Sequence, residues 1–307
     1  MQLFVIIGLV TRPAPSVDEE DEFVPVPLVY ALLPNKTQES YATVFRDIKE
    51  KVTQLVVPNV TPNTITGDFE LAVSNAAEEI FPTANVRYCF FYMGQSLYRQ
   101  VQSEGLQAQY SNPDDRSLRE ATHMTLALAF VPTDDIEEVF NKLHDDVPDS
   151  FVPIIQYFEE NYVIGRRARG RRQTVPPRFL PSKWNAYEAT LQNQQRTNIS
   201  EGWHNRFAQV NSNHHPSLYA AFVEICNEQA DTETILTQVD LGQAVRRAPK
   251  KKWLVVQQRI RTIVADYGRY KEEADQLTYL RNLRYNFVLW SVKRMVVSSK
   301  NCRKLQH

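Results

Sequence analysis

The feature that most constrains this fold is a pair of apolar, β-branched stretches near the start of the chain. Residues 3–10 (LFVIIGLV) and 24–33 (VPVPLVYALL) are continuous runs of the kind that forms buried strands. The stretch between them, TRPAPSVDEEDE, is acidic and rich in proline, which is typical of a hairpin loop. The sequence therefore predicts two paired strands at the beginning of the chain.

Helical and strand patterns then alternate. The stretch after Gln38 predicts a helix with Thr37 as its candidate N-cap, because apolar residues recur there at helical spacing. NTITGDFE predicts a short strand ending at Asp68, residues 70–80 predict a helix, and NVRYCFFY predicts the next strand. The order strand, strand, helix, strand, helix, strand is typical of a mixed α/β sheet.

After Tyr92 the pattern becomes helical. Apolar residues repeat at helical spacing in three stretches, which contain Ile136, Val139, Phe140 and Leu143; Ile154, Ile155, Phe158 and Tyr162; and Trp253, Val256, Ile260, Ile263, Val264 and Tyr267. The stretch GRRARGRRQTVPPRFLPSKW interrupts them with arginines and prolines, and we expect it to form a loop.

Charge provides a local rather than a global indication of a partner. The chain has 35 basic and 36 acidic residues, a net charge of −1, so its overall balance does not indicate nucleic-acid binding. Two basic clusters are nevertheless candidates for contacts with a DNA backbone. They contain Arg166, Arg167, Arg169, Arg171 and Arg172, and Arg246, Arg247, Lys250, Lys251 and Lys252. A solvated loop or a nuclear-import signal explains each cluster equally well.

Other features limit the class of protein. Cys89, Cys226 and Cys302 are too widely spaced to indicate a disulfide framework or a zinc site, so a reducing compartment is expected. The opening MQLFVIIGLV has no preceding basic residue, and we interpret it as a buried strand rather than a signal peptide. No other apolar run approaches the roughly 20 residues that a membrane-spanning helix requires.

Two acidic residues, at the end of a predicted strand and at the start of a predicted helix, are candidate metal ligands. Asp68 follows Gly67 at the end of a predicted strand, and Glu201 begins a predicted helix whose opposite face carries Trp203 and Phe207. Each acid also has an ordinary structural explanation. An aspartate after a glycine is commonly a turn residue, and an early glutamate favours the positive end of a helix.

Five stretches together resemble the transposase domain of Mutator-like elements, in the same order, over roughly residues 1–225. They are PLVYALLPNKTQESYATVF, GDFELAVSNAAEEIFPTANVRYCFFYMGQSLYRQVQ, ALAFVPTDDIEEVFNKL, YFEENYVIGR and RTNISEGWHNRF. The resemblance implies a ribonuclease H-like fold in which two Asp and one Glu bind two divalent ions, Mg²⁺ or Mn²⁺, for cleavage and strand transfer of DNA. It assigns Asp68 as the second acid and Glu201 as the third, and it implies a nuclear protein.

The resemblance also implies a division of the chain. Residues 1–94 are expected to form the ribonuclease H-like core and residues 95–195 a large helical insertion. Residues 196–225 would form the return helix that carries the third acid, and residues 226–307 a helical C-terminal region.

The sequence departs from the family pattern in several places. Family members carry the first Asp in a strand that precedes the one matched by residues 2–10, so we expect the first acid and the central strand to be absent from the chain as written. The family's Cys-x-x-His is here Cys89-Phe-Phe-Tyr92, and a phenol cannot replace an imidazole as a nitrogen ligand. RTNISEGWHN has one Asn where most relatives have two. His204 is a further candidate for contact with a phosphate, although a packed or surface position explains it as well.

These observations favour a transposase-derived protein that binds DNA mainly through its backbone and that is inactive as written. A non-catalytic DNA-binding or protein-interaction derivative of the same fold is the alternative. A helical interaction protein without DNA contact is a weaker hypothesis, supported only by the amphipathic C-terminal third. Assembly into a homo-oligomer is left open.

Overall fold

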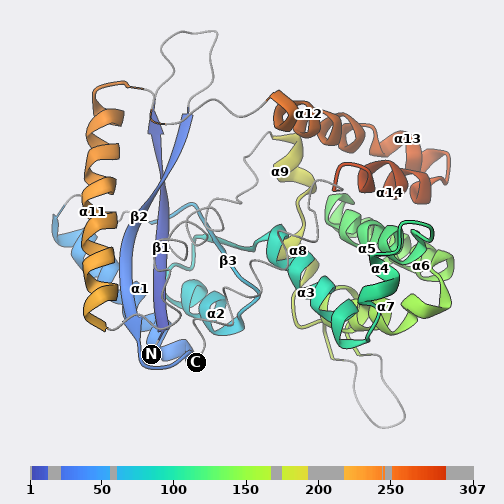
Figure 1. The fold of residues 1–307 in the computed structure, drawn as a ribbon, viewed down its shortest axis with the longest axis horizontal. Helices are drawn as coiled ribbons and strands as arrows, with labels where there is room; N and C mark the ends of the chain where they lie inside the picture. Colours follow the sequence, from blue (N-terminus) through green and yellow to red (C-terminus); the bar gives the residue numbers. More distant parts are fainter. Residues whose placement is uncertain are drawn as a thin grey trace.

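A computed structural model of the chain describes residues 2–12, 22–55, 61–166, 175–192, 218–243, 245 and 251–287. A part that contains all the described strands lies on the left of Figure 1, and a helical part lies on the right. The elements are β1 (Gln2–Arg12), β2 (Glu22–Leu33), α1 (Gln38–Leu55), β3 (Thr64–Gly67), α2 (Leu71–Ile80), β4 (Asn85–Tyr88), α3 (Phe90–Ser103), α4 (Gln107–Tyr110), α5 (Ser117–Ala127), η1 (Leu128–Phe130), η2 (Thr133–Asp135), α6 (Ile136–Asp146), η3 (Asp149–Phe151), α7 (Val152–Phe158), the π-helix η4 (Glu159–Val163), α8 (Pro181–Trp184), α9 (Tyr187–Leu191), α11 (Leu218–Asp240), α12 (Lys251–Ala265), α13 (Tyr267–Glu272) and α14 (Gln276–Arg284).

The predicted N-terminal hairpin is confirmed. Strands β1 and β2 pair antiparallel from Gln2 opposite Leu33 to Arg12 opposite Glu22, with one register irregularity after Ile6. Helix α1 begins at Gln38, and the hydroxyl of Thr37 accepts a hydrogen bond from the backbone N–H of Ser40 at 3.3 Å. This bond satisfies one of the free donors at the helix start, as predicted for an N-cap.

The mixed α/β class is confirmed. Among the described residues the strands form two separate two-stranded sheets, the antiparallel pair β1–β2 and the parallel pair β3–β4. The register of the second pair runs from Thr64 opposite Asn85 to Gly67 opposite Tyr88. No described strand joins β1 to β3, so hydrogen bonding does not connect the two pairs.

A shared apolar core holds the two pairs together instead. Phe4 of β1 meets the rings of Tyr41 and Phe45 on α1 at 5.0 and 6.1 Å, and Phe45 meets Phe81 at 5.9 Å. Ala76 and Ala77 of α2 and Val86 of β4 are buried in the same cluster. Helices α1 and α2 pack against each other in this cluster, which also contains residues of both strand pairs, so they form a common helical layer for the β-containing part.

Helix α11 covers a different stretch of the hairpin. Its buried Val239 packs with Val24 and Val26 of β2, together with the partly buried Val10 of β1, and Figure 1 shows the helix running alongside both strands. The helix begins at Leu218 and ends at Asp240, so it crosses the predicted division at 225/226. Helix α3 crosses the other predicted division at 94/95 in the same way, and the four-part division stays a prediction.

The helical part has one large core built from two separate stretches of sequence. Helices α3 to α9 contribute most of it, and residues of α12 to α14 complete it with Ile260, Val264, Tyr279, Leu280 and Leu283. The predicted C-terminal helical region is therefore split, because α11 lies on the hairpin whereas α12 to α14 belong to the helical part. No described helix is both long enough and apolar enough to span a membrane.

The strand predicted over NVRYCFFY is wrong in its second half. Strand β4 ends at Tyr88, Cys89 is the N-cap residue of α3, and Phe90 is the first helical residue. The physical reason is the helical spacing of the apolar residues that follow, since Met93, Leu97 and Val101 are all buried against the helical core.

The Asp68 turn as a candidate metal site

Asp68 lies in a tight turn at the carboxyl end of the parallel strand pair. Strand β3 ends at Gly67, whose carbonyl accepts a hydrogen bond of 2.9 Å from the backbone N–H of Cys89, the residue that follows β4. The carbonyl of Asp68 accepts one of 2.7 Å from the N–H of Glu70, and α2 begins at Leu71. These bonds close the turn at the edge of the sheet where ligands commonly bind in open α/β folds.

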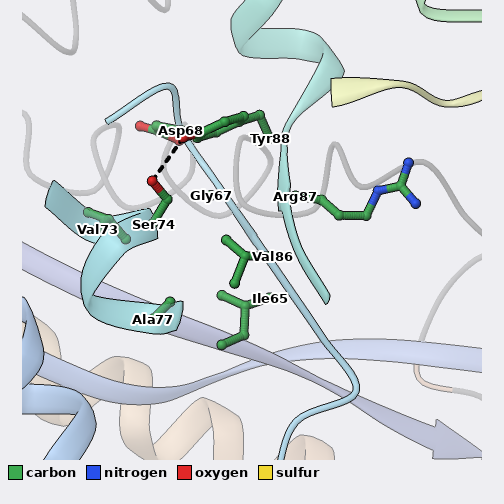
Figure 2. Close-up of a pocket in the computed structure, with 9 residues that line it drawn as sticks. All are labelled: Ile65, Gly67, Asp68, Val73, Ser74, Ala77, Val86, Arg87 and Tyr88. Carbon is green, nitrogen blue, oxygen red and sulfur yellow. Dashed lines mark hydrogen bonds between the residues drawn. The ribbon is translucent and has the colours of Figure 1, made fainter. Parts of the chain in front are cut away.

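A small pocket opens beneath the turn (Figure 2). The volume that the centre of a water molecule can occupy in this pocket is about 10 Å³, so the pocket holds about one water molecule. Ser74 and Tyr88 join their hydroxyl groups at 2.8 Å below Asp68, while the side chain of Arg87 points away from the pocket. The remaining lining residues are Ile65, Gly67, Val73, Ala77 and Val86. The interior is thus apolar, and the charged group stands at its mouth.

The surroundings of Asp68 raise the pKa of its carboxyl group to about 6. The largest cause is desolvation by the protein around the mouth of the pocket, followed by the negative charge of Glu70. The positive charges of Lys36 and Arg99 oppose the rise. The side chain nevertheless reaches solvent, so it is available to an ion and remains mostly ionised at neutral pH.

Glu70 and Tyr41 form the support behind Asp68. The hydroxyl of the buried Tyr41 donates a hydrogen bond of 2.8 Å to Oε1 of Glu70, and burial together with that carboxylate raises the pKa of Tyr41. The Tyr41 hydroxyl therefore stays protonated and holds Glu70 in place. The sequence pattern places Tyr41 only on the helix face and does not single out Glu70, although an acid two residues after a candidate ligand is a usable signal.

The donor chemistry of this turn fits a hard divalent ion in part. Mg²⁺ and Mn²⁺ prefer carboxylate oxygens, and a cation beside Asp68 would relieve the repulsion from Glu70. Within the described ranges, however, no group of three or more potential ligands comes together. Asp68 is therefore fitted to be one ligand of a site that needs further donors.

The other predicted site residues are only partly described. Glu201 and His204 lie outside the described residues. Cys89 is buried at the N-cap of α3, and the half-buried Tyr92 lies in the first turn of that helix, with its ring 5.6 Å from that of Phe91. Cys89 and Tyr92 thus follow the strand next to Asp68, but Cys89 precedes a helix and Tyr92 lies in that helix, where a strand was predicted.

Most of the predicted DNA-binding residues also fall outside the described part. Arg166 is described: its guanidinium lies 3.6 Å from the carboxylate of Glu160 on the surface, and its backbone forms an isolated bridge with Val175. Lys251 and Lys252 begin α12, but their side chains are not described. The residues that lie wholly outside the described ranges are Arg167, Arg169, Arg171, Arg172, Arg246, Arg247 and Lys250.

Comparison with known families supports the resemblance noted from the sequence. Residues 14–96 match the family model of the MULE transposase domain. No curated protein and no solved structure matched the chain. The matched segment includes the β2 strand, the α1–α2 layer, the β3–β4 pair and the Asp68 turn. Residues 14–96 of this chain are therefore similar to the MULE transposase domain.

Proposed function

We propose that this chain is a transposase-derived protein of the Mutator-like class, that it binds DNA and that it holds a divalent metal ion at Asp68. The observation that carries the proposal is the position of Asp68 inside the matched domain, at the carboxyl end of β3 and beside β4. In the ribonuclease H-like arrangement the second acid stands in such a turn. Glu201 would supply the third acid from beyond the described residues.

The division of roles among the side chains follows from the geometry. Asp68 would bind Mg²⁺ or Mn²⁺ through its carboxylate, and Glu70 would stay fixed by its hydrogen bond from Tyr41. In the ancestral reaction of the family, two such ions held by all three acids would supply activation of water or of a DNA 3′-hydroxyl for attack on a phosphodiester. Tyr92 stands where the family pattern has a histidine, so it would donate a hydrogen bond but bind no metal through nitrogen.

The separation of the two strand pairs supports the ribonuclease H-like part of the proposal. In that arrangement one further strand lies between the counterparts of β1 and β3 and carries the first acid. Among the described residues β1 pairs only with β2 and β3 only with β4, while α1 and α2 cover both pairs. Asp68 and Glu201 would be two of the three acids, so we expect this polypeptide by itself to bind DNA without cutting it.

Contacts with DNA would come chiefly from the two basic clusters. Arginine and lysine bind phosphates without reading sequence, and each neutralised phosphate releases counterions. The affinity should therefore fall steeply with salt and depend little on base sequence. A non-catalytic DNA-binding or protein-interaction derivative is the second candidate, favoured by Tyr92 in place of the family histidine.

The proposal is tested by calorimetric titration of the 307-residue protein with Mn²⁺, combined with DNA binding measured at several salt concentrations. Asp68→Asn and Glu201→Gln should each weaken Mn²⁺ binding by about tenfold or more. Asp47→Asn is the matched control, since Asp47 is an exposed aspartate on α1. If salt-sensitive DNA binding persists but neither substitution changes Mn²⁺ affinity, the metal assignment is wrong and the non-catalytic candidate is favoured.

A further inference from the structure

Phe69 connects the Asp68 turn, which lies in the strand-containing part, to the helical part. It stands between Asp68 and Glu70, next to the β3–β4 pair. Its ring is partly buried and packs against the core of the helical part rather than against the α1–α2 core. The residue between the two acids therefore packs against the helical part in addition to its own strand pair.

Three aromatic rings surround Phe69. It stacks on Tyr88 of β4 with ring centres 4.7 Å apart and planes 19° apart. It meets Tyr162 of η4 edge to face at 5.4 Å and Phe179, which precedes α8, at 4.9 Å. Tyr88 and Phe179 also meet each other edge to face at 5.2 Å. We call these four residues the aromatic junction.

Hydrogen bonds fix the members of the aromatic junction on both sides. On the strand side, Tyr88 shares a hydrogen bond of 2.8 Å with Ser74. On the helical side, the Tyr162 hydroxyl donates to Ser96 at 2.9 Å. The buried indole N–H of Trp184 lies 3.1 Å from the carbonyl of Tyr162 and 3.0 Å from that of Phe179, so one donor holds both backbones. Tyr88, Tyr162 and the backbone of Phe179 are thus each bound by hydrogen bonds to neighbouring elements.

Two polar contacts beside the aromatic junction also join the strand-containing part to the helical part. The guanidinium of Arg87 on β4 donates to the carbonyl of Asn185, which follows α8. The ammonium group of Lys183 on α8 lies 2.6 Å from the carboxylate of Glu78 on α2. The segment around α8 is thus attached to both β4 and α2, close in sequence to Phe179.

We propose that Phe69 is a positioning residue that couples the Asp68 turn to the helical part, so that docking of the helical part sets where the Asp68 carboxylate lies. The effect on metal binding rests on the function proposed above, whereas the coupling itself does not. The hydrogen bonds described for the turn join it to Cys89 after β4 and to Tyr41 on α1, both in the strand-containing part. Phe69 is the residue of the turn whose side chain reaches across to Tyr162 and Phe179.

The test compares the full-length protein with Phe69→Leu and Phe179→Leu, using Phe140→Leu as the matched control. Phe140 is fully buried in the same helical core, on α6, so its loss reports general destabilisation. Phe69→Tyr keeps the ring and serves as the conservative variant. Two quantities are measured: hydrogen exchange of the turn amides, including the hydrogen-bonded amide of Glu70, without metal, and the dissociation constant for Mn²⁺.

We expect Phe69→Leu and Phe179→Leu each to accelerate exchange of the turn amides about tenfold and to weaken Mn²⁺ binding about tenfold, the scale seen when supports of metal ligands are removed. Phe140→Leu should accelerate exchange of the turn amides no more than it accelerates exchange of the whole protein, and it should leave the dissociation constant for Mn²⁺ unchanged. Phe69→Tyr should behave like the native protein in both measurements. The double variant Phe69→Leu/Phe179→Leu should be less than additive, because both changes remove the same ring packing.

The coupling is refuted if Phe179→Leu leaves exchange of the turn no faster than Phe140→Leu does, or if the two leucine substitutions are additive. The metal assignment fails separately, if Asp68→Asn leaves Mn²⁺ affinity unchanged. In that case the exchange measurement still decides whether the helical part holds the turn.

Discussion

Acidification should destabilise the helical part of the chain through His123. This residue is buried on α5, where the hydroxyl of Tyr110 lies 3.2 Å from its Nε2. Burial lowers the pKa of His123 to about 4, and the positive charges of Arg119 and Arg284 act in the same direction. The native protein therefore holds a neutral imidazole across the range in which a solvated histidine becomes charged.

The sign and size of the effect follow from proton linkage. A free histidine titrates near pH 6.5, so between about pH 6.5 and pH 4 the unfolded chain binds more protons at this residue than the native chain does. The stability is fully present above that range and is lost as the pH falls through it. The whole interval corresponds to about 3 kcal/mol, of which about 2 kcal/mol is lost between pH 8 and pH 5.

The assay is urea unfolding followed by circular dichroism at pH 8 and pH 5, for the native protein and for His123→Gln. Glutamine cannot be protonated in this range, and its side-chain oxygen can still accept a hydrogen bond from Tyr110. Asp68, whose raised pKa acts in the opposite direction, is common to both proteins and cancels in the comparison. The native protein should lose about 2 kcal/mol more than the variant, and an equal loss in both would refute the reasoning.

Three further predictions concern the helical part and the basic clusters. Leu280→Ala on α14 removes a fully buried side chain and should lower the free energy of unfolding by about 2–5 kcal/mol. The control Leu254→Ala, at an exposed position on α12, should change the free energy of unfolding by under about 1 kcal/mol. Equal effects of the two substitutions in urea unfolding would show that α14 is not part of this core. Tyr267→Phe removes a hydrogen bond of 2.9 Å to Asp135 and should cost about 1 kcal/mol, whereas no change in thermal unfolding would mean that this hydrogen bond does not hold α13 to η2. Replacing the five arginines of residues 166–172 by glutamine should flatten the dependence of DNA affinity on salt by about 0.9 in logarithmic slope for each phosphate that is no longer neutralised, and an unchanged slope in fluorescence anisotropy would exclude this cluster as the DNA-binding surface.

The elements that were predicted correctly are those that depend on the pattern of neighbouring residues in the sequence. The β-branched runs at 3–10 and 24–33 have no helical periodicity and form the hairpin, and Thr37 precedes an amphipathic stretch and caps α1. The stripe through Ile260 and Val264 is buried as expected. The prediction of a strand over NVRYCFFY was wrong in its second half because a short apolar run fits a helix start as well as a strand, and the packing of residues further along α3 favours the helix.

Long-range packing could not be predicted in this way. Nothing in the sequence near α12 to α14 shows that these helices complete the core begun at α3, since only tertiary packing joins the two stretches. The Asp68 turn was predicted from its glycine and its place after a strand. The role of Phe69 was not predicted, because Tyr162 and Phe179 lie far along the chain and meet it only in the folded protein.

The most direct test of the account is to locate Mn²⁺ on the protein by nuclear magnetic resonance, through the broadening that the ion causes in nearby backbone amide signals. The signals of the Gly67 to Glu70 amides and of the Cys89 amide should broaden at the lowest Mn²⁺ concentration. Asp68→Asn should abolish this broadening, whereas Asp47→Asn should not. Broadening centred elsewhere, for example on the acidic residues 18–22, with the Asp68 turn unaffected, would contradict the assignment of a metal site to this turn.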